Sequence, residues 1–213
     1  MAGQPAAVSA SAARRILLRK WSPTCTCAST IATPPSNTFE SIRREAWEVA
    51  YRHIYSQDEI DRYFDGKSQE GRTWPSMPCQ HEETLICEVQ QPTTATRGTC
   101  AGTCTANAAS PQQSSTRVCA YAKWGWTRNA QAELHSLYVS PQYWNQGCGS
   151  MLWEAIMKTC GSEQITSMDI WVLKAARSGE FYAARGCKCV DEGDYFIGDK
   201  RETAQNYRWT PKI

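Results

Sequence analysis

Long apolar runs are absent from this 213-residue sequence. No stretch approaches the ~20 consecutive apolar residues that a helix needs to span a bilayer, so we expect no membrane insertion. An excess of charge of either sign is absent too, because 23 Lys and Arg against 21 Asp and Glu leave a net charge of only +2. Nucleic-acid-binding proteins usually carry a basic patch or stripe. We therefore expect no nucleic-acid partner.

The first 38 residues contain no acidic side chain, and they lack the continuous apolar core of a secretory signal peptide. The basic residues in this segment cluster at Arg14, Arg15, Arg19 and Lys20. Basic, Ser-rich and acid-poor composition is typical of an organellar transit peptide, but we favour a disordered tail and a cytoplasmic location. Within the segment, residues 16–18 are a candidate first strand.

Metal-ligand spacing is also missing, although the chain has eleven Cys. The close pairs are Cys25 and Cys27, Cys100 and Cys104, and Cys187 and Cys189. None has zinc-ribbon spacing, and the three His are scattered. We expect reduced thiols and no metal site, with some disulfides or a metal site as alternatives. Cys148 and Cys187 suit small buried apolar positions.

What is present is enough apolar sequence, 41%, for one core of ordinary domain size. We assign residues 39–213 to a single domain. Apolar periodicity predicts two helices between residues 39 and 63, with Asp58 capping the second. Residues 84–89 and 118–126 each predict a β-strand. Residues 91–116 between them have almost no large apolar side chain, which indicates a flexible insertion.

The C-terminal third predicts a strand at residues 168–173 that is buried on both faces. A short helix at residues 176–185 follows and ends at Gly186. Residues 188–191 and 206–210 are the last two expected strands, with a polar loop at residues 193–202 between them. This order of elements predicts a mixed α/β sheet with a ligand site at the carboxyl end of the central strands.

Residues 133–158 form the most informative stretch. They predict a strand (133–140), a turn that begins at Pro141, a glycine-bearing loop (145–150) and an amphipathic helix. Gly147 and Gly149 fall where the helix begins, so a ligand can approach the backbone closely. Free amides at a helix N-terminus favour a phosphate or pyrophosphate. An ordinary turn that requires glycine is the alternative.

Two ordered motifs resemble those of the GNAT N-acetyltransferase superfamily. Leu137-Tyr138-Val139-Ser140-Pro141, followed by Gly147-Cys148-Gly149-Ser150, is similar to the family's acetyl-CoA loop. Residues 181–187, Phe-Tyr-Ala-Ala-Arg-Gly-Cys, are similar to its Phe-Tyr-x-x-x-Gly-Phe segment. Trp144 departs from the Gln or Arg of the loop pattern, and Ala175 replaces a cofactor-contacting Asn. The resemblance extends from about residue 39 to the end.

The resemblance implies a mixed, mostly antiparallel sheet flanked by helices, with a V-shaped split between the central strands. It also implies that the strands at residues 84–89 and 118–126 pair as a hairpin, with the insertion at its tip. It implies acetyl-CoA as co-substrate, with the pantetheine arm along the strand backbone and the pyrophosphate on the loop amides. The expected cofactor-binding residues are Leu137, Tyr138, Val139, Gln146, Gly147, Cys148, Gly149 and Ser150.

Three side chains are candidates for catalysis. Tyr182 matches the family's proposed general acid to the CoA sulfur, and its ordinary pKa near 10 keeps it protonated at neutral pH. Glu133 occupies a strand position where many members carry a carboxylate that takes the amine proton. His135 points to the same strand face and is the second candidate base. Packing or sheet roles are the alternatives for all three.

We therefore expect an acetyl-CoA-dependent N-acetyltransferase that acts by direct transfer. Its acceptor would be a primary amine of a small molecule or peptide, and the protein a monomer or homodimer. A non-catalytic CoA-binding relative is the alternative, motivated by Ala175 and Trp144. A Cys-rich redox or metal protein is a third, weaker hypothesis.

Overall fold

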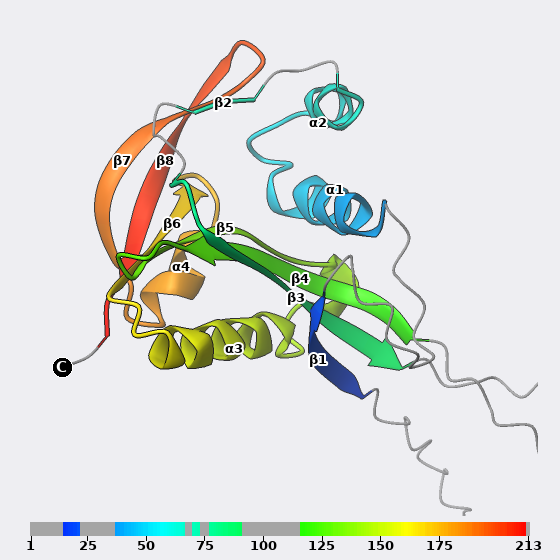
Figure 1. Cartoon of the computed structure of the whole chain (residues 1–213). Coiled ribbons are helices and arrows are strands. Elements are labelled where there is room, and N and C mark those ends of the chain that lie inside the picture. The colour runs from blue at the N-terminus through cyan, green and yellow to red at the C-terminus, as the bar shows by residue number, and fades with distance from the viewer. Residues whose placement is uncertain (1–14, 22–36, 67–69, 73–76, 91–115, 212–213) are drawn as a thin grey trace, which may run out of the picture.

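The computed structural model describes residues 15–21, 37–66, 70–72, 77–90 and 116–211 (Figure 1). The helices are α1 (Thr38–Ala50), α2 (Gln57–Phe64), a 3-10 turn η1 (Pro141–Tyr143), α3 (Cys148–Ser162) and α4 (Ser178–Ala183). The strands are β1 (Ile16–Trp21), β2 (Glu70–Arg72), β3 (His81–Gln90), β4 (Thr116–Trp126), β5 (Gln131–Val139), β6 (Ser167–Leu173), β7 (Lys188–Ile197) and β8 (Lys200–Trp209). Within these ranges, no helix combines the length and apolarity needed to cross a bilayer.

The strands form one sheet in the order β1-β3-β4-β5-β6-β8-β7-β2. Only β5 and β6 are parallel among the described neighbours. Helices α1 and α2 lie over one face, and α3 and α4 lie over the other (Figure 1). The predicted mixed, mostly antiparallel sheet flanked by helices is confirmed.

The parallel strands β5 and β6 separate partway along their length. They pair only from Gln131 opposite Ser167 to Leu134 opposite Ile170. The remainder of β5 pairs with β4 alone among the described strands. This is the V-shaped split expected between the central strands, and it opens the sheet at its middle.

A β-bulge in β5 changes which side chains face the split. The register with β4 shifts between Lys123 and Trp124, which leaves His135 as the extra residue. The β5 side chains that pack in the core beside α3 are Ala132, Leu134, Leu137 and Val139. Strict alternation from Ala132 would have placed residues 136 and 138 there. The bulge therefore shifts the alternation by one residue, and Tyr138 faces α1.

The N-terminal half confirms some expectations and corrects others. The candidate first strand is present as β1, which pairs antiparallel with β3, so residues 16–21 of the expected tail belong to the sheet. The predicted hairpin is β3 with β4. The expected insertion at residues 91–116 lies outside the described residues, except for Thr116, which begins β4. The expected tail at residues 1–38 also lies outside them, except for residues 15–21, 37 and 38.

The expected polar loop at residues 193–202 is wrong. These residues continue β7 and β8 into a long antiparallel hairpin that turns after Ile197, with Gly198 at φ 57°. Polar side chains misled the prediction because most of this hairpin is exposed or half-buried, and strands of that kind accept them. Gly179 of α4 lies against β8 so closely that a Cβ there would come within 2.8 Å of the Tyr207 hydroxyl oxygen.

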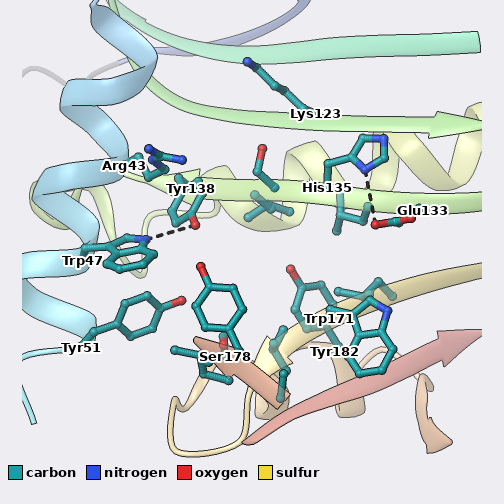
Figure 2. A pocket seen from close by; sticks show the side chains of 18 of the residues that line it. Arg43, Trp47, Tyr51, Lys123, Glu133, His135, Tyr138, Trp171, Ser178 and Tyr182 are labelled. Carbon is teal, nitrogen blue, oxygen red and sulfur yellow. Dashed lines mark hydrogen bonds and ion pairs between the residues drawn. The ribbon is translucent and has the colours of Figure 1, made fainter. Parts of the chain in front are cut away.

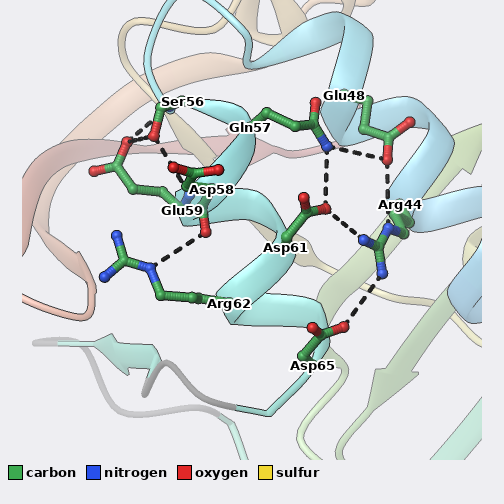
Figure 3. A network of polar contacts seen from close by, with 9 residues as sticks. All are labelled: Arg44, Glu48, Ser56, Gln57, Asp58, Glu59, Asp61, Arg62 and Asp65. Atoms are coloured by element: carbon green, nitrogen blue, oxygen red, sulfur yellow. Dashed lines mark hydrogen bonds and ion pairs between the residues drawn. The ribbon is translucent and has the colours of Figure 1, made fainter.

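Polar contacts tie α2 to α1 (Figure 3). The cap of α2 is Ser56 and not the expected Asp58, because Ser56 and Glu59 form a capping box. The Ser56 amide donates to Glu59 Oε2 at 2.7 Å. On the side facing α1, Arg44 pairs with Asp61, and with Asp65 at 3.6 Å. These contacts fix the helix pair over the split.

We expect the substitution Ser56→Ala to lower the free energy of unfolding by about 1 kcal/mol, because the Glu59 amide loses its side-chain acceptor. The measurement is urea denaturation followed by circular dichroism. Ser41→Ala, on the exposed surface of α1, is the matched control and should change stability little. An equal loss in both variants would contradict the role of the cap.

We expect Gly147→Ala to destabilise the fold by about 1–2 kcal/mol, because Gly147 has φ 87° at the N-cap of α3, a left-handed conformation that costs L-residues energy. Gly161→Ala is the control within the same helix. Gly161 lies in the last turn of α3 with open space around it and without a positive φ, so Ala there should be neutral or slightly stabilising. Paired urea titrations measure both, and a larger loss at Gly161 would contradict this account.

Candidate functional site

Two adjoining cavities meet at Tyr182. The inner pocket, about 280 Å³, lies in the split and is lined by residues 133–138 of β5, residues 170–173 of β6 and side chains of α1. The loop pocket, about 650 Å³, is lined by residues 137–139, by most of the loop from Tyr143 to Ser150 and by α4. Trp47, Tyr138 and Tyr182 line both. The arrangement offers one ligand a place at the loop and a second ligand a place in the split.

The loop pocket contains the start of α3. Gly147 provides no side-chain cap, and the amides of Cys148, Gly149 and Ser150 have no hydrogen-bond acceptor among the described residues. Such amides sit at the positive end of the helix dipole and favour an anion. A Cβ at Gly149 would come within 3.3 Å of the Phe181 ring, so the loop also packs closely on α4.

Arg185 adds a full positive charge to this pocket. Its Nη2 donates to Ser150 Oγ at 2.7 Å, and its guanidinium lies 3.5 Å from the centroid of the Phe181 ring. It lines the loop pocket together with the amides of α3. Helix amides combined with a guanidinium are well suited to a pyrophosphate. The residues present therefore fit the phosphate end of a coenzyme A.

The edge of β5 is partly engaged already. The indole N–H of Trp144 donates to the Val139 carbonyl at 2.7 Å. A carbonyl oxygen can accept two hydrogen bonds, so the edge retains acceptor capacity for an extended chain. The Gln146 side chain donates to the Gln142 carbonyl at 2.8 Å, and Gln146 does not line the loop pocket. Among the expected cofactor residues, Gln146 is therefore the one whose placement fits least.

Tyr182 lies on α4, where the two pockets join, with 6% of its surface exposed. Burial, with smaller contributions from Tyr138 and Cys187, raises the pKa of Tyr182 well above its ordinary value of about 10. Its hydroxyl is therefore protonated at neutral pH and able to donate a proton or a hydrogen bond.

Glu133 and His135 lie together on β5 in the inner pocket (Figure 2). Glu133 is 4% exposed, and its Oε2 accepts the Met77 amide at 2.7 Å. Its Oε1 lies 3.6 Å from His135 Nδ1. The buried His135 Nε2 has no hydrogen-bond partner among the described residues. The first candidate base, Glu133, and the alternative candidate, His135, thus lie in one pocket with Tyr182.

Aromatic rings and positive charges dominate the remainder of the inner pocket. The aromatic lining residues are Trp47, Tyr51, Tyr63, Tyr121, Tyr138, Trp171, Tyr182 and Tyr195. Arg43 of α1 and Lys123 of β4 are the basic residues, and Glu133 is the carboxylate among the described lining residues. Trp47 and Tyr51 of the α1 segment line the inner pocket, whereas the nearby Tyr55 is a core residue.

Three thiols lie beneath the loop. Cys87, Cys119 and Cys148 are buried, with 3.9 Å between the sulfurs of Cys119 and Cys148. Hydrogen bonding to Cys148 and burial both raise the pKa of Cys87 and Cys119, so these two thiols are protonated. Cys148 has 1% of its surface exposed, as expected for a small apolar residue.

Sequence reasoning located the loop and the three catalytic candidates, but it missed Arg43, Lys123 and Arg185. Arg185 lies inside the segment that carried the resemblance, so its helix spacing from Phe181 was a usable signal. No sequence signal pairs Arg43 with Lys123, because they come together only when α1 covers β4.

Comparison with known proteins agrees with this geometry. The acetyltransferase (GNAT) family model matches residues 39–187. The solved PaiA N-acetyltransferase from Thermoplasma acidophilum, in complex with coenzyme A, has a TM-score of 0.50 and 16% identity, over 92% of this chain and 99% of that one. A GCN5-related N-acetyltransferase from Rhodopseudomonas palustris has a TM-score of 0.52 and 14% identity, over 92% and 95%.

These two structures share the fold at low identity, whereas no curated protein matches the chain significantly. The family model covers well over half of the sequence, including both the glycine loop and the Phe181–Tyr182 segment. The chain therefore belongs to the acetyltransferase (GNAT) family of acyltransferases.

Proposed function

We propose that this acetyltransferase moves the acetyl group of acetyl-CoA directly to a primary amine, with Tyr182 as general acid. The single observation that supports this most is the row of unpaired amides at Cys148–Ser150 beside the protonated Tyr182 hydroxyl. Anion binding and proton donation are thereby available in two adjoining pockets. The coenzyme A in the Thermoplasma acidophilum structure is consistent with this assignment.

Acetyl-CoA supplies an activated thioester when bound. The α3 amides and Arg185 would bind its phosphates, and the backbone of residues 137–139 would orient the arm that leads into the split. Glu133, or His135 as the second candidate, would take the proton from the amine so that its lone pair can attack. The Tyr182 hydroxyl would donate a proton to the departing sulfur.

A non-catalytic CoA-binding protein is the second candidate. Ala175 replaces the cofactor-contacting amide, and its carbonyl lies 2.8 Å from His53 Nε2. The Trp144 indole N–H already donates one hydrogen bond to the Val139 carbonyl, which is part of the strand edge that the arm of the cofactor would follow. Calorimetric binding of acetyl-CoA without thiol release across a panel of amines would favour this candidate, whereas release of CoA with any amine would exclude it.

We expect Tyr182→Phe to lower kcat about 10²-fold or more, because the proton donor is removed while the ring is kept. The dissociation constant of acetyl-CoA, measured by calorimetry, should change little. Tyr55→Phe is the control, a buried tyrosine outside both pockets. Equal turnover in Tyr182→Phe and wild type would remove Tyr182 from the mechanism.

The raised pKa of Tyr182 predicts the alkaline side of the pH profile. The hydroxyl loses its proton only above its ordinary pKa, so activity should show no decline from this group below about pH 10. A decline below pH 10 that disappears in Tyr182→Phe would contradict the raised pKa of Tyr182, although it would still assign the titrating group to Tyr182.

We expect Glu133→Gln to reduce kcat about 10²-fold or more without weakening acetyl-CoA binding, because the amide cannot accept the amine proton. His135→Gln is measured beside it, and Glu82→Gln, an exposed side chain near the start of β3, is the control. A large loss in His135→Gln alone would transfer the role of base to His135. Full activity in both variants would contradict a base on β5.

A further inference from the structure

We propose that the acceptor of this enzyme is a small amine with a carboxylate and an aromatic or apolar body, such as an aromatic amino acid. This inference rests on the proposed N-acetyltransferase function and adds the class of acceptor. Its basis is the distribution of charge and aromatic surface in the inner pocket.

The charges on the lining side chains have opposite signs in different parts of the pocket. Figure 2 shows Arg43 on α1, near Trp47 and Tyr138, with Glu133 and His135 farther along β5. Lys123 lies on the neighbouring strand β4, opposite Ser136. Glu133, which already accepts the Met77 amide, is the acidic residue of the described lining. A ligand with its amine near Glu133 and its carboxylate near Arg43 would match both ends.

Arg43 and Lys123 are held in place by aromatic rings. The Arg43 guanidinium lies 5.3 Å from the centroid of the Tyr63 ring and 5.0 Å from that of Phe64. Lys123 Nζ lies 5.5 Å from the centroid of the Phe39 ring. Cation–π contacts orient a side chain while it keeps its positive charge. The pocket therefore presents oriented cations, and a guanidinium in particular recognises carboxylates.

The same charges disfavour polycationic acceptors. A polyamine or an aminoglycoside carries several ammonium groups, and each needs an acidic or carbonyl partner to offset its desolvation. The described lining offers one carboxylate against two permanent cations and a histidine. Like charges at short range in a partly enclosed pocket repel, and such repulsion gives specificity against the wrong ligand.

The remaining surface favours a flat apolar body. Trp47 stacks on Tyr63 with 4.8 Å between ring centroids, and Tyr121, Tyr138 and Trp171 add further ring surface to the lining. Aromatic side chains bind apolar rings by offset or edge contacts. The inner pocket measures about 280 Å³, near the lower limit of small-molecule sites, so the acceptor is small.

The experiment compares three amines as acceptors with saturating acetyl-CoA: L-phenylalanine, phenethylamine and spermidine. The first two share the amine and the ring and differ in the carboxylate. We expect kcat/KM to be about tenfold or more higher for phenylalanine than for phenethylamine, because the carboxylate of phenylalanine adds one charge-assisted hydrogen bond. Spermidine should be the poorest. Equal or better use of phenethylamine or spermidine would overturn the inference.

Variants locate the effect. Arg43→Gln and Lys123→Gln should raise KM for phenylalanine with little change in kcat, and should leave phenethylamine unaffected. Arg43→Lys, which keeps the charge, should restore part of the lost affinity. Lys123 is exposed, so its substitution does not endanger folding. Lys158→Gln, an exposed lysine on α3, is the charge-matched control. Unchanged KM in both Gln variants would overturn the inference.

Calorimetry separates failure of this inference from failure of the proposed function. Phenylalanine is titrated into the CoA-bound protein and into Arg43→Gln. Phenylalanine binding to the wild type that is lost in Arg43→Gln would support the acceptor class, even if no amine is acetylated. Absence of acetylation would then contradict only the N-acetyltransferase function. CoA release with spermidine, together with no phenylalanine binding, would support the enzyme and overturn the acceptor class.

Discussion

Loss of pairing between β5 and β6 beyond Leu134 is the constraint on which the site depends. A strand that pairs on one side only exposes a row of backbone donors and acceptors, which is normally a liability. Here the open edge lines two pockets whose other walls include residues of α1, α3 and α4, so it is available to a ligand. The Trp144 indole on the Val139 carbonyl shows how this edge is partly satisfied by the protein itself.

The β-bulge at His135 decides what the split contains. Without the extra residue, the small Ser136 would point toward α3, and Leu137 would point toward α1. With it, Leu137 and Val139 pack in the α3 core, while Glu133, His135 and Tyr138 share the inner pocket. One inserted residue thus separates the apolar support of the loop from the polar groups that would handle protons.

Much of this arrangement followed from local patterns. Gly147 and Gly149 located the start of α3, and the motifs at residues 137–141 and 181–187 indicated the family and its split sheet. Long-range features could not be read in the same way. The length of the β7–β8 hairpin was hidden because its polar residues resemble a loop, and the bulge at His135 depends on register with β4. Arg43 and Lys123 line the same pocket only as a result of tertiary packing.

The absence of a side chain at Gly179 has a consequence for how Tyr182 is positioned. Backbone of α4 rests directly on the Tyr207 ring of β8, with no intervening side chain to absorb movement. Tyr182 follows three residues later on the same short helix, and its ring lies 6.5 Å from that of Tyr207, centroid to centroid. A displacement of Tyr207 on β8 would therefore press directly on the α4 backbone, so the position of the Tyr182 side chain depends on where the outer hairpin lies.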